Sequence, residues 1–119
     1  MASRIPFLIC LLLLVATFTT TPSVRSVDQS TSVTEIDNEH VTVRRNIHAP
    51  HASIPMHSHA AGVIVYLTDV QERSTAPDGI SKKVFHKAGD VLWAPARQHA
   101  LENLSDHQTE VIEIEMKQR

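Results

Sequence analysis

Residues 89–103 read GDVLWAPARQHALEN, and this stretch decides how the chain can fold. Gly89 opens a turn, and the apolar run after it has the length of one short β-strand. Pro95 ends that strand, because proline has no amide hydrogen to donate to a sheet. His99 follows four residues later. The stretch therefore predicts two successive strands, with a histidine on the second.

A second histidine motif precedes this stretch at His57-Ser58-His59. On an extended strand, residues two apart point to the same face, so both imidazoles can approach one ion at about 2.0–2.1 Å. His99, on a different strand, is suited to close such a site across a barrel. The three histidines together predict a site for a divalent metal ion.

The remaining pattern favours strands throughout. Residues 62–69 form a continuous β-branched and aromatic run, and Asp78-Gly79 marks a hairpin turn. Residues 109–117 alternate, which predicts that Ile112, Ile114 and Met116 face inward and that Glu113, Glu115 and Lys117 face outward. No window after the N-terminal segment keeps a helical apolar period, so we expect an all-β sandwich or barrel.

The N-terminal segment has the features of a signal peptide. Arg4 precedes an apolar run, Ile5 to Ala16, which is too short for the roughly 20 residues that span a bilayer. We expect cleavage after Ser26, with positions nearer Ala16 or Thr20 as alternatives, and therefore a secreted or periplasmic protein without a stable membrane anchor. The alternative is an uncleaved anchor. The predicted organisation is a signal peptide at 1–26, a flexible lead-in at 27–39 and one β-domain at 40–119.

Composition excludes several classes of function. The chain has 119 residues and a formal net charge of -2, so it lacks the basic surface of a nucleic-acid-binding protein. Its one cysteine, Cys10, lies within the predicted signal peptide, which leaves the mature chain without a disulfide or a thiol nucleophile. Three glycines are too few for a dinucleotide-binding fingerprint.

The two histidine-bearing segments resemble the two conserved motifs of the cupin superfamily, and most closely those of small single-domain cupins. The resemblance covers about residues 41–116. It implies a double-stranded β-helix, the jelly-roll barrel of cupins, with His57, His59 and His99 as the metal ligands. Iron, zinc, manganese, nickel and copper all suit imidazole ligands, so the metal stays open.

Two positions depart from the cupin pattern. The glutamate ligand that usually follows the first motif is replaced by Val63 or Ile64, and we expect Val63→Glu to tighten metal binding. Arg97 stands where glycine is usual. Its guanidinium is suited either to an anionic substrate or to solvent.

A metal held by three histidines alone resembles the sites of thiol dioxygenases in the same superfamily. This resemblance implies a metal-dependent, dioxygenase-like enzyme acting on a small molecule. A non-catalytic metal or ligand-binding module fits the residues as well, and so does a metal-free structural homodimer. His51, Tyr66 and Trp93 are auxiliary candidates for the pocket. The apolar run Val63 to Leu67 predicts that a second copy covers the outside of the barrel.

Overall fold

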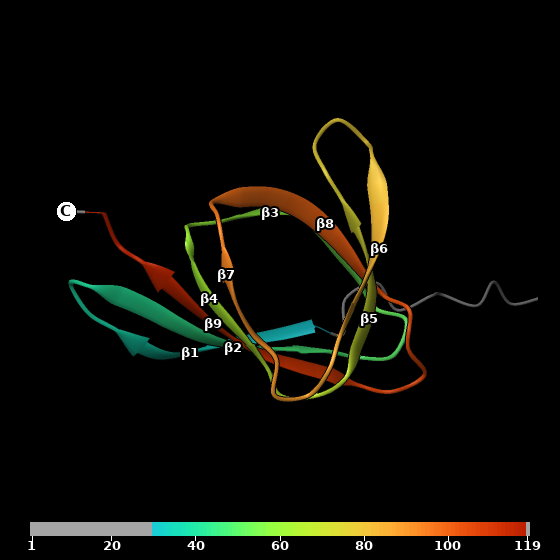
Figure 1. Cartoon of the computed structure of the whole chain (residues 1–119), viewed down its shortest axis with the longest axis horizontal. Helices are drawn as coiled ribbons and strands as arrows, with labels where there is room; N and C mark the ends of the chain where they lie inside the picture. Colours follow the sequence, from blue (N-terminus) through green and yellow to red (C-terminus); the bar gives the residue numbers. More distant parts are fainter. Residues whose placement is uncertain (1–29, 119) are drawn as a thin grey trace, which may run out of the picture.

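The computed structural model describes residues 30–118, which form nine β-strands and no helix (Figure 1). The predicted signal peptide at 1–26 lies outside the described residues. Within them, no helix has the length and apolarity to cross a membrane. The strands are β1 (Ser30–Asp37), β2 (Val41–His48), β3 (Ser53–His59), β4 (Gly62–Tyr66), β5 (Val70–Thr75), β6 (Ser81–His86), β7 (Val91–Ala94), β8 (Arg97–Asn103) and β9 (Thr109–Met116).

The strands form two antiparallel sheets that face each other. The larger sheet has the order β1-β2-β9-β4-β7, and the smaller one has the order β3-β8-β5-β6. The chain passes repeatedly between the sheets, which curve around a common interior (Figure 1). This arrangement confirms the all-β prediction and is consistent with a double-stranded β-helix. The break at Pro95 separates β7 from β8 as the sequence predicted.

Two glycines are required by the backbone. Gly79 lies in the predicted turn between β5 and β6 and has a φ of 84°, a conformation that side chains disfavour. The turn spans residues 76–80, because Thr75 pairs with Ser81. Gly62 begins β4 where β9 passes very close. A Cβ there would lie 2.0 Å from the carbonyl oxygen of Ile114. Any larger residue at position 62 would push these two strands apart.

The domain begins earlier than the sequence predicted. The expected flexible lead-in at 27–39 contains β1, which pairs with β2 from Ser30↔His48 to Asp37↔Thr42. The segment looked loose because most of its side chains are polar or small. Strand pairing uses backbone groups, so a polar segment beside an available sheet edge can still form a strand.

The prediction for the two faces of β9 was wrong. Glu113 and Glu115 line the interior between the sheets, and Ile112 and Ile114 lie on the outside of the larger sheet. The prediction assumed that the apolar side of an alternating strand faces the interior. Here the interior carries polar side chains, because it contains the candidate site described below.

The outside of the larger sheet is correspondingly apolar. Trp93 and Val91 on the edge strand β7 are 62% and 63% exposed. Cross-strand pairing places Val63 between Trp93 and Ile114. We call this surface the outer apolar face. Its members are Val33, Ile36, Val43, Val63, Val65, Val91, Trp93, Ile112, Ile114 and Met116.

The buried apolar core is small and borders the cavity between the sheets. Ile64, Tyr66, Val70 and Ala94 form it, and Leu92 and Val111 pack against it. Tyr66 is therefore a buried residue, as expected for an aromatic on an inner strand. The rest of the interior is an open cavity lined by both polar and apolar side chains.

Candidate metal centre

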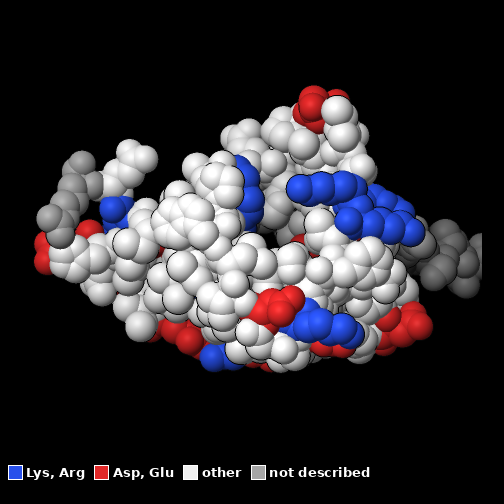
Figure 2. Space-filling view, in the orientation of Figure 1, with Lys and Arg blue, Asp and Glu red and all other residues white. Residues whose placement is uncertain are grey.

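A cavity of about 580 Å³ lies between the two sheets. The larger sheet contributes inward side chains from β2, β4, β7 and β9, and the smaller sheet contributes them from all four of its strands. The space-filling view shows a hollow beside the projecting β5–β6 hairpin, with Lys and Arg side chains near its rim (Figure 2). The size of the cavity suits a small molecule.

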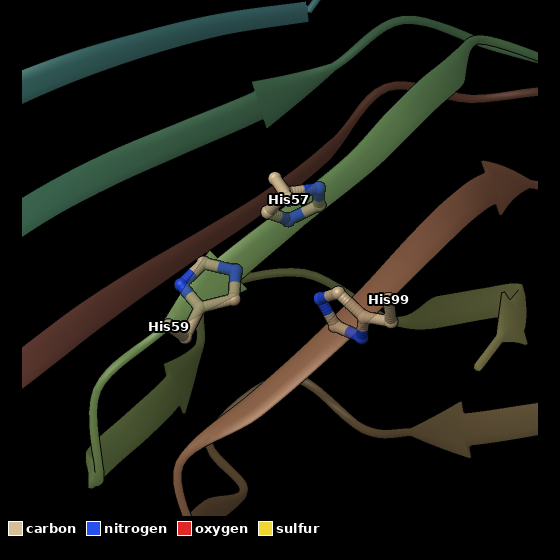
Figure 3. A group of neighbouring side chains, drawn as sticks. All are labelled: His57, His59 and His99. Carbon is tan, nitrogen blue, oxygen red and sulfur yellow. The ribbon is translucent and has the colours of Figure 1, made fainter. Parts of the chain in front are cut away.

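The three predicted histidines meet on one wall of this cavity (Figure 3). β3 carries His57 and His59, and β8 places His99 directly opposite His57 in the strand register. The ring centroids are 4.7 Å apart for His57 and His59, 4.8 Å for His57 and His99, and 5.3 Å for His59 and His99. Their donor atoms all lie within 4.8 Å of one another. The pattern of two histidines two residues apart thus produces the predicted cluster.

Each ring of the cluster uses Nδ1 for a hydrogen bond within the protein. His57 Nδ1 lies 2.7 Å from the carbonyl oxygen of Pro55, and His59 Nδ1 lies 2.7 Å from a Glu115 carboxylate oxygen. His99 Nδ1 lies 3.3 Å from Ser74 Oγ. A carbonyl or carboxylate at Nδ1 requires the proton there, which leaves the Nε2 lone pair free for a metal.

His99 carries the most direct indication of a ligand site in the cluster. Its Nε2 is buried and has no hydrogen-bond partner among the described residues. A buried, unsatisfied nitrogen costs free energy unless a ligand completes it. Burial lowers the pKa of His99 to about 4, and His57 and Arg97 add to the shift, so the ring is neutral near pH 7. A neutral, orphaned imidazole nitrogen is what a divalent metal ion requires.

Two carboxylates support His59 from the larger sheet. Glu113 and Glu115 oxygens lie 3.0 and 2.7 Å from its Nδ1. Burial opposes protonation of His59, but the two carboxylates outweigh it and raise its pKa. Arg97 pairs with Glu113, and Arg44 pairs with Glu115 at 3.0 Å. Since these carboxylates are already paired with arginines, they are better placed to orient His59 than to hold the ion, although their oxygens and His59 also form a group that could hold a metal ion.

The position of the missing glutamate ligand is now defined. Ile64 is the β4 residue that faces the cavity, whereas Val63 belongs to the outer apolar face. The expectation that Val63→Glu tightens metal binding was therefore wrong by one residue, which reverses the face. Glu113 lies opposite Ile64 on the neighbouring strand. A carboxylate is thus present beside the site, but a different strand supplies it.

Of the four auxiliary candidates, Tyr66, Arg97 and Trp93 are among the residues around the cavity, and His51 is not. Tyr66 lines the cavity and stacks on His86, with ring centroids 4.1 Å apart. Arg97 also lines the cavity, where its Nη2 donates a hydrogen bond to Glu113. Trp93 borders the cavity from an edge strand with its side chain mostly exposed. His51 is not among the lining residues, and its Nε2 lies 2.7 Å from Asp106.

Five histidines and glutamates that line the cavity had no place in the predicted site. Alternation alone could have placed them inside, because each lies on the same strand face as a cavity residue. The signal was misread because buried glutamates are rare and histidines near turns are usually exposed. The residues are His48, Glu72, His86, Glu113 and Glu115.

Comparison with solved structures identifies the fold. A cupin domain from Bordetella pertussis Tohama I matches with a TM-score of 0.70 and 27% sequence identity, covering 75% of this chain and 94% of that chain. This chain is a small cupin. No protein-family model and no curated protein matches its sequence.

Other matches show how varied the proteins with this barrel are. The polyketide cyclase RemF from Streptomyces resistomycificus matches with a TM-score of 0.57 and 18% identity, covering 76% of the cupin described here and 66% of RemF. Oxalate decarboxylase from Bacillus subtilis, a protein with Mn(II) centres, matches with a TM-score of 0.55 and 21% identity. The match covers 76% of the cupin described here and 26% of the decarboxylase chain. At these identities the likeness extends to the fold alone.

Removing the charge of Glu113 should weaken metal binding by this cupin. Glu113→Gln keeps a hydrogen-bond acceptor near His59 but loses the carboxylate and leaves Arg97 without its partner. Outer hydrogen bonds to metal-binding histidines typically change affinity about 10–100-fold. We expect a loss in that range, measured by competition with a chelator. Glu110→Gln is the control, because Glu110 lies on the same strand and pairs with Arg45 outside the cavity. Equal affinities for wild type and Glu113→Gln would contradict the assignment.

Proposed function

We propose that this cupin is exported from the cytoplasm, holds a divalent transition-metal ion on His57, His59 and His99, and acts on a small molecule in the adjoining cavity. The observation that carries the proposal is the hydrogen bonding of the cluster. All three rings engage Nδ1 within the protein, and His99 Nε2 is buried without a partner. Structural histidines satisfied by packing would not need this arrangement.

The chain's own residues prepare the cluster for a cation. Glu113 and Glu115 place negative charge behind His59, which makes Nε2 a stronger electron-pair donor. Ser74 and the Pro55 carbonyl set the orientations of His99 and His57. When bound, a divalent ion would supply Lewis-acid activation of a ligand at its open coordination positions.

The cavity favours a small-molecule enzyme over a simple metal carrier. A protein that only stores a metal has no need of about 580 Å³ of adjoining space. The apolar part of the wall, from Leu92, Leu101 and Val111, suits a ligand with a nonpolar portion. Oxygenation is the reaction type that we propose to screen first, by O2 uptake of the metal-loaded protein.

Cobalt(II) titration of the chelator-treated protein tests the metal site. We expect visible absorption bands that saturate near one equivalent and are absent in His57→Ala. Bound cobalt should also raise the melting temperature, because a ligand that binds only the folded state stabilises it by mass action. Absorption bands of equal strength in His57→Ala would place the ion elsewhere.

We further propose that the outer apolar face is covered by a second copy of the chain. Monomeric proteins rarely expose contiguous apolar patches of more than a few hundred Å². The face spans all five strands of the larger sheet. Arg45 lies within this face, opposite Val33 and Ile112. Glu35 and Glu110 pair with its guanidinium, so burial of the face would not leave that charge unpaired.

Trp93→Asp should therefore convert a dimer into a monomer. The substitution places a charge on a surface that association would remove from water. Sedimentation velocity at micromolar concentration should show the mass halved for this variant. Ile80→Asp, at an exposed position on the β5–β6 turn, should leave the mass unchanged. A compact wild-type monomer under the same conditions would contradict the dimer.

A further inference from the structure

Glu72 lies inside the cavity without any part in the histidine cluster. It is on β5, two residues before Ser74, so both side chains point to the same face of the strand. Ser74 Oγ contacts His99 Nδ1. Same-face neighbours are about 7 Å apart along a strand. Glu72 therefore lies about 7 Å along the cavity wall from Ser74, the residue that contacts His99.

The described residues offer the Glu72 carboxyl group no hydrogen bond and no ion pair. Other charged and titratable groups do face the same cavity: Arg44 and His48 from β2, His57 and His59 from β3, Tyr66 from β4, Lys82 and His86 from β6, Arg97 and His99 from β8, and Glu113 and Glu115 from β9. Arg97, whose positive charge opposes the rise in the Glu72 pKa, is bound to Glu113. Glu72 is thus an acidic group in a partly enclosed cavity with its own charge uncompensated.

This environment keeps the carboxyl group close to its titration point. Burial raises the pKa of Glu72 to about 7, the negative charge of Glu113 adds to the shift, and Arg97 opposes it. A carboxyl group that titrates near neutrality can both accept and donate a proton under ordinary conditions. The other glutamates at the cavity, Glu113 and Glu115, are held by arginines and by His59 and cannot do this without losing those contacts.

A structural role does not account for Glu72. An unpartnered carboxyl group in a cavity destabilises the folded protein, and a leucine or glutamine would fit a strand as well. Groups that lower stability in this way are concentrated at functional sites.

We propose that Glu72 is the acid–base group of the cavity, taking a proton from a protic small molecule that binds at the histidine cluster and returning it when that molecule leaves. The inference rests on the proposed function. In the binding direction, the ligand's O–H or N–H bond breaks and its electron pair stays with the ligand anion. A new O–H bond forms on Glu72. The ligands concerned are neutral acids that bind as anions.

Two probes separate proton transfer from simple binding. Acetohydroxamic acid is protonated at neutral pH and binds metals as its anion, whereas azide is already an anion. Stopped-flow absorption would follow both probes binding to the cobalt(II)-loaded protein. We expect Glu72→Gln to lower the rate of acetohydroxamic acid binding roughly tenfold or more. The rate of azide binding should stay within about twofold of the wild-type rate. Glu102→Gln is the matched control, because Glu102 pairs with Arg73 away from the cluster. An equal effect on both probes, or no effect on either, overturns the inference.

A metal-free measurement keeps the two proposals separate. If the wild-type protein takes up no cobalt, the proposed metal site fails and the probe experiment cannot be run. Glutamate carboxyl NMR of the chelator-treated protein then decides the acid–base inference independently. A resonance that titrates near pH 7 and disappears in Glu72→Gln supports it. Titration of every glutamate below pH 5.5 or so contradicts it.

Discussion

Replacing His99 with alanine should abolish metal binding while leaving the barrel folded. Among the described residues the His99 ring makes one hydrogen bond, between its Nδ1 and Ser74 Oγ, so its removal takes little from the fold. Its Nε2, by contrast, is the buried and unsatisfied atom of the cluster. Loss of an outer hydrogen bond to a ligand already costs about 10–100-fold in affinity, so loss of a ligand should cost at least roughly 100-fold. Calorimetric titration and circular dichroism would measure affinity and fold.

His51→Ala is the matched control for this experiment. His51 is exposed, lies outside the cavity lining and contacts Asp106. Its removal also lowers the histidine content by one, but it should leave metal affinity unchanged. Wild-type affinity in His99→Ala would show that the cluster is a packed polar group. A comparable loss in His51→Ala would indicate nonspecific binding to surface histidines.

Replacing Glu72 with glutamine should stabilise the metal-free protein at alkaline pH. In the unfolded chain the carboxyl group has an ordinary pKa of 4.5, and in the folded protein burial raises the pKa to about 7. Between these values the folded state holds a proton that the unfolded state releases. The free energy of unfolding of the wild type therefore falls as the pH rises through this window. Below it, the carboxyl group is protonated in both states and the destabilisation vanishes.

The expected difference is at most about 3 kcal/mol above pH 7, since one pKa unit corresponds to about 1.4 kcal/mol. Urea unfolding with chelator present, at pH 4.5 and pH 8 or so, would measure it. Glu72→Gln should be more stable than wild type at the higher pH and should lose this part of the pH dependence. Glu102→Gln should keep the wild-type profile. Parallel profiles for wild type and Glu72→Gln would mean that the carboxyl group is not held in an unfavourable environment.

The elements that the sequence predicted well are those with a local physical signal. The Pro95 break, the Asp78-Gly79 turn and the continuous apolar run on β4 each depend on a few neighbouring residues. The histidine pair on β3 also needs only strand alternation to share a face. His99 joined them through the resemblance of its segment to a cupin motif, and the pairing of His57 with His99 shows why that spacing brings them together.

The parts that were missed depend on which side of a strand is inside. Alternation on β9 is clear in the sequence, but it does not state whether Ile114 or Glu113 faces the interior. The usual rule places apolar residues inside, and in this protein the interior is the polar site. For the same reason, the Val63→Glu prediction put the missing glutamate ligand at position 63, whereas Ile64 is the residue that faces the cavity. Only the tertiary arrangement of the two sheets resolves it.

The environment of Glu72 could not be predicted for a related reason. Its environment is built from residues on β4, β6, β8 and β9 that are distant in the chain. A glutamate in the polar segment QERST gives no local sign of burial. Its charge environment appears only when the smaller sheet closes over the larger one.

The metal content of the protein as purified tests the central claim most directly. The chain should be produced from residue 27, without a histidine tag and without chelator, and subjected to elemental analysis beside His57→Ala. We predict close to one equivalent of a transition metal in the wild type and none in the variant. Absence of bound metal in the wild type, even after reconstitution with iron, zinc, manganese, nickel and copper, would contradict the metal centre.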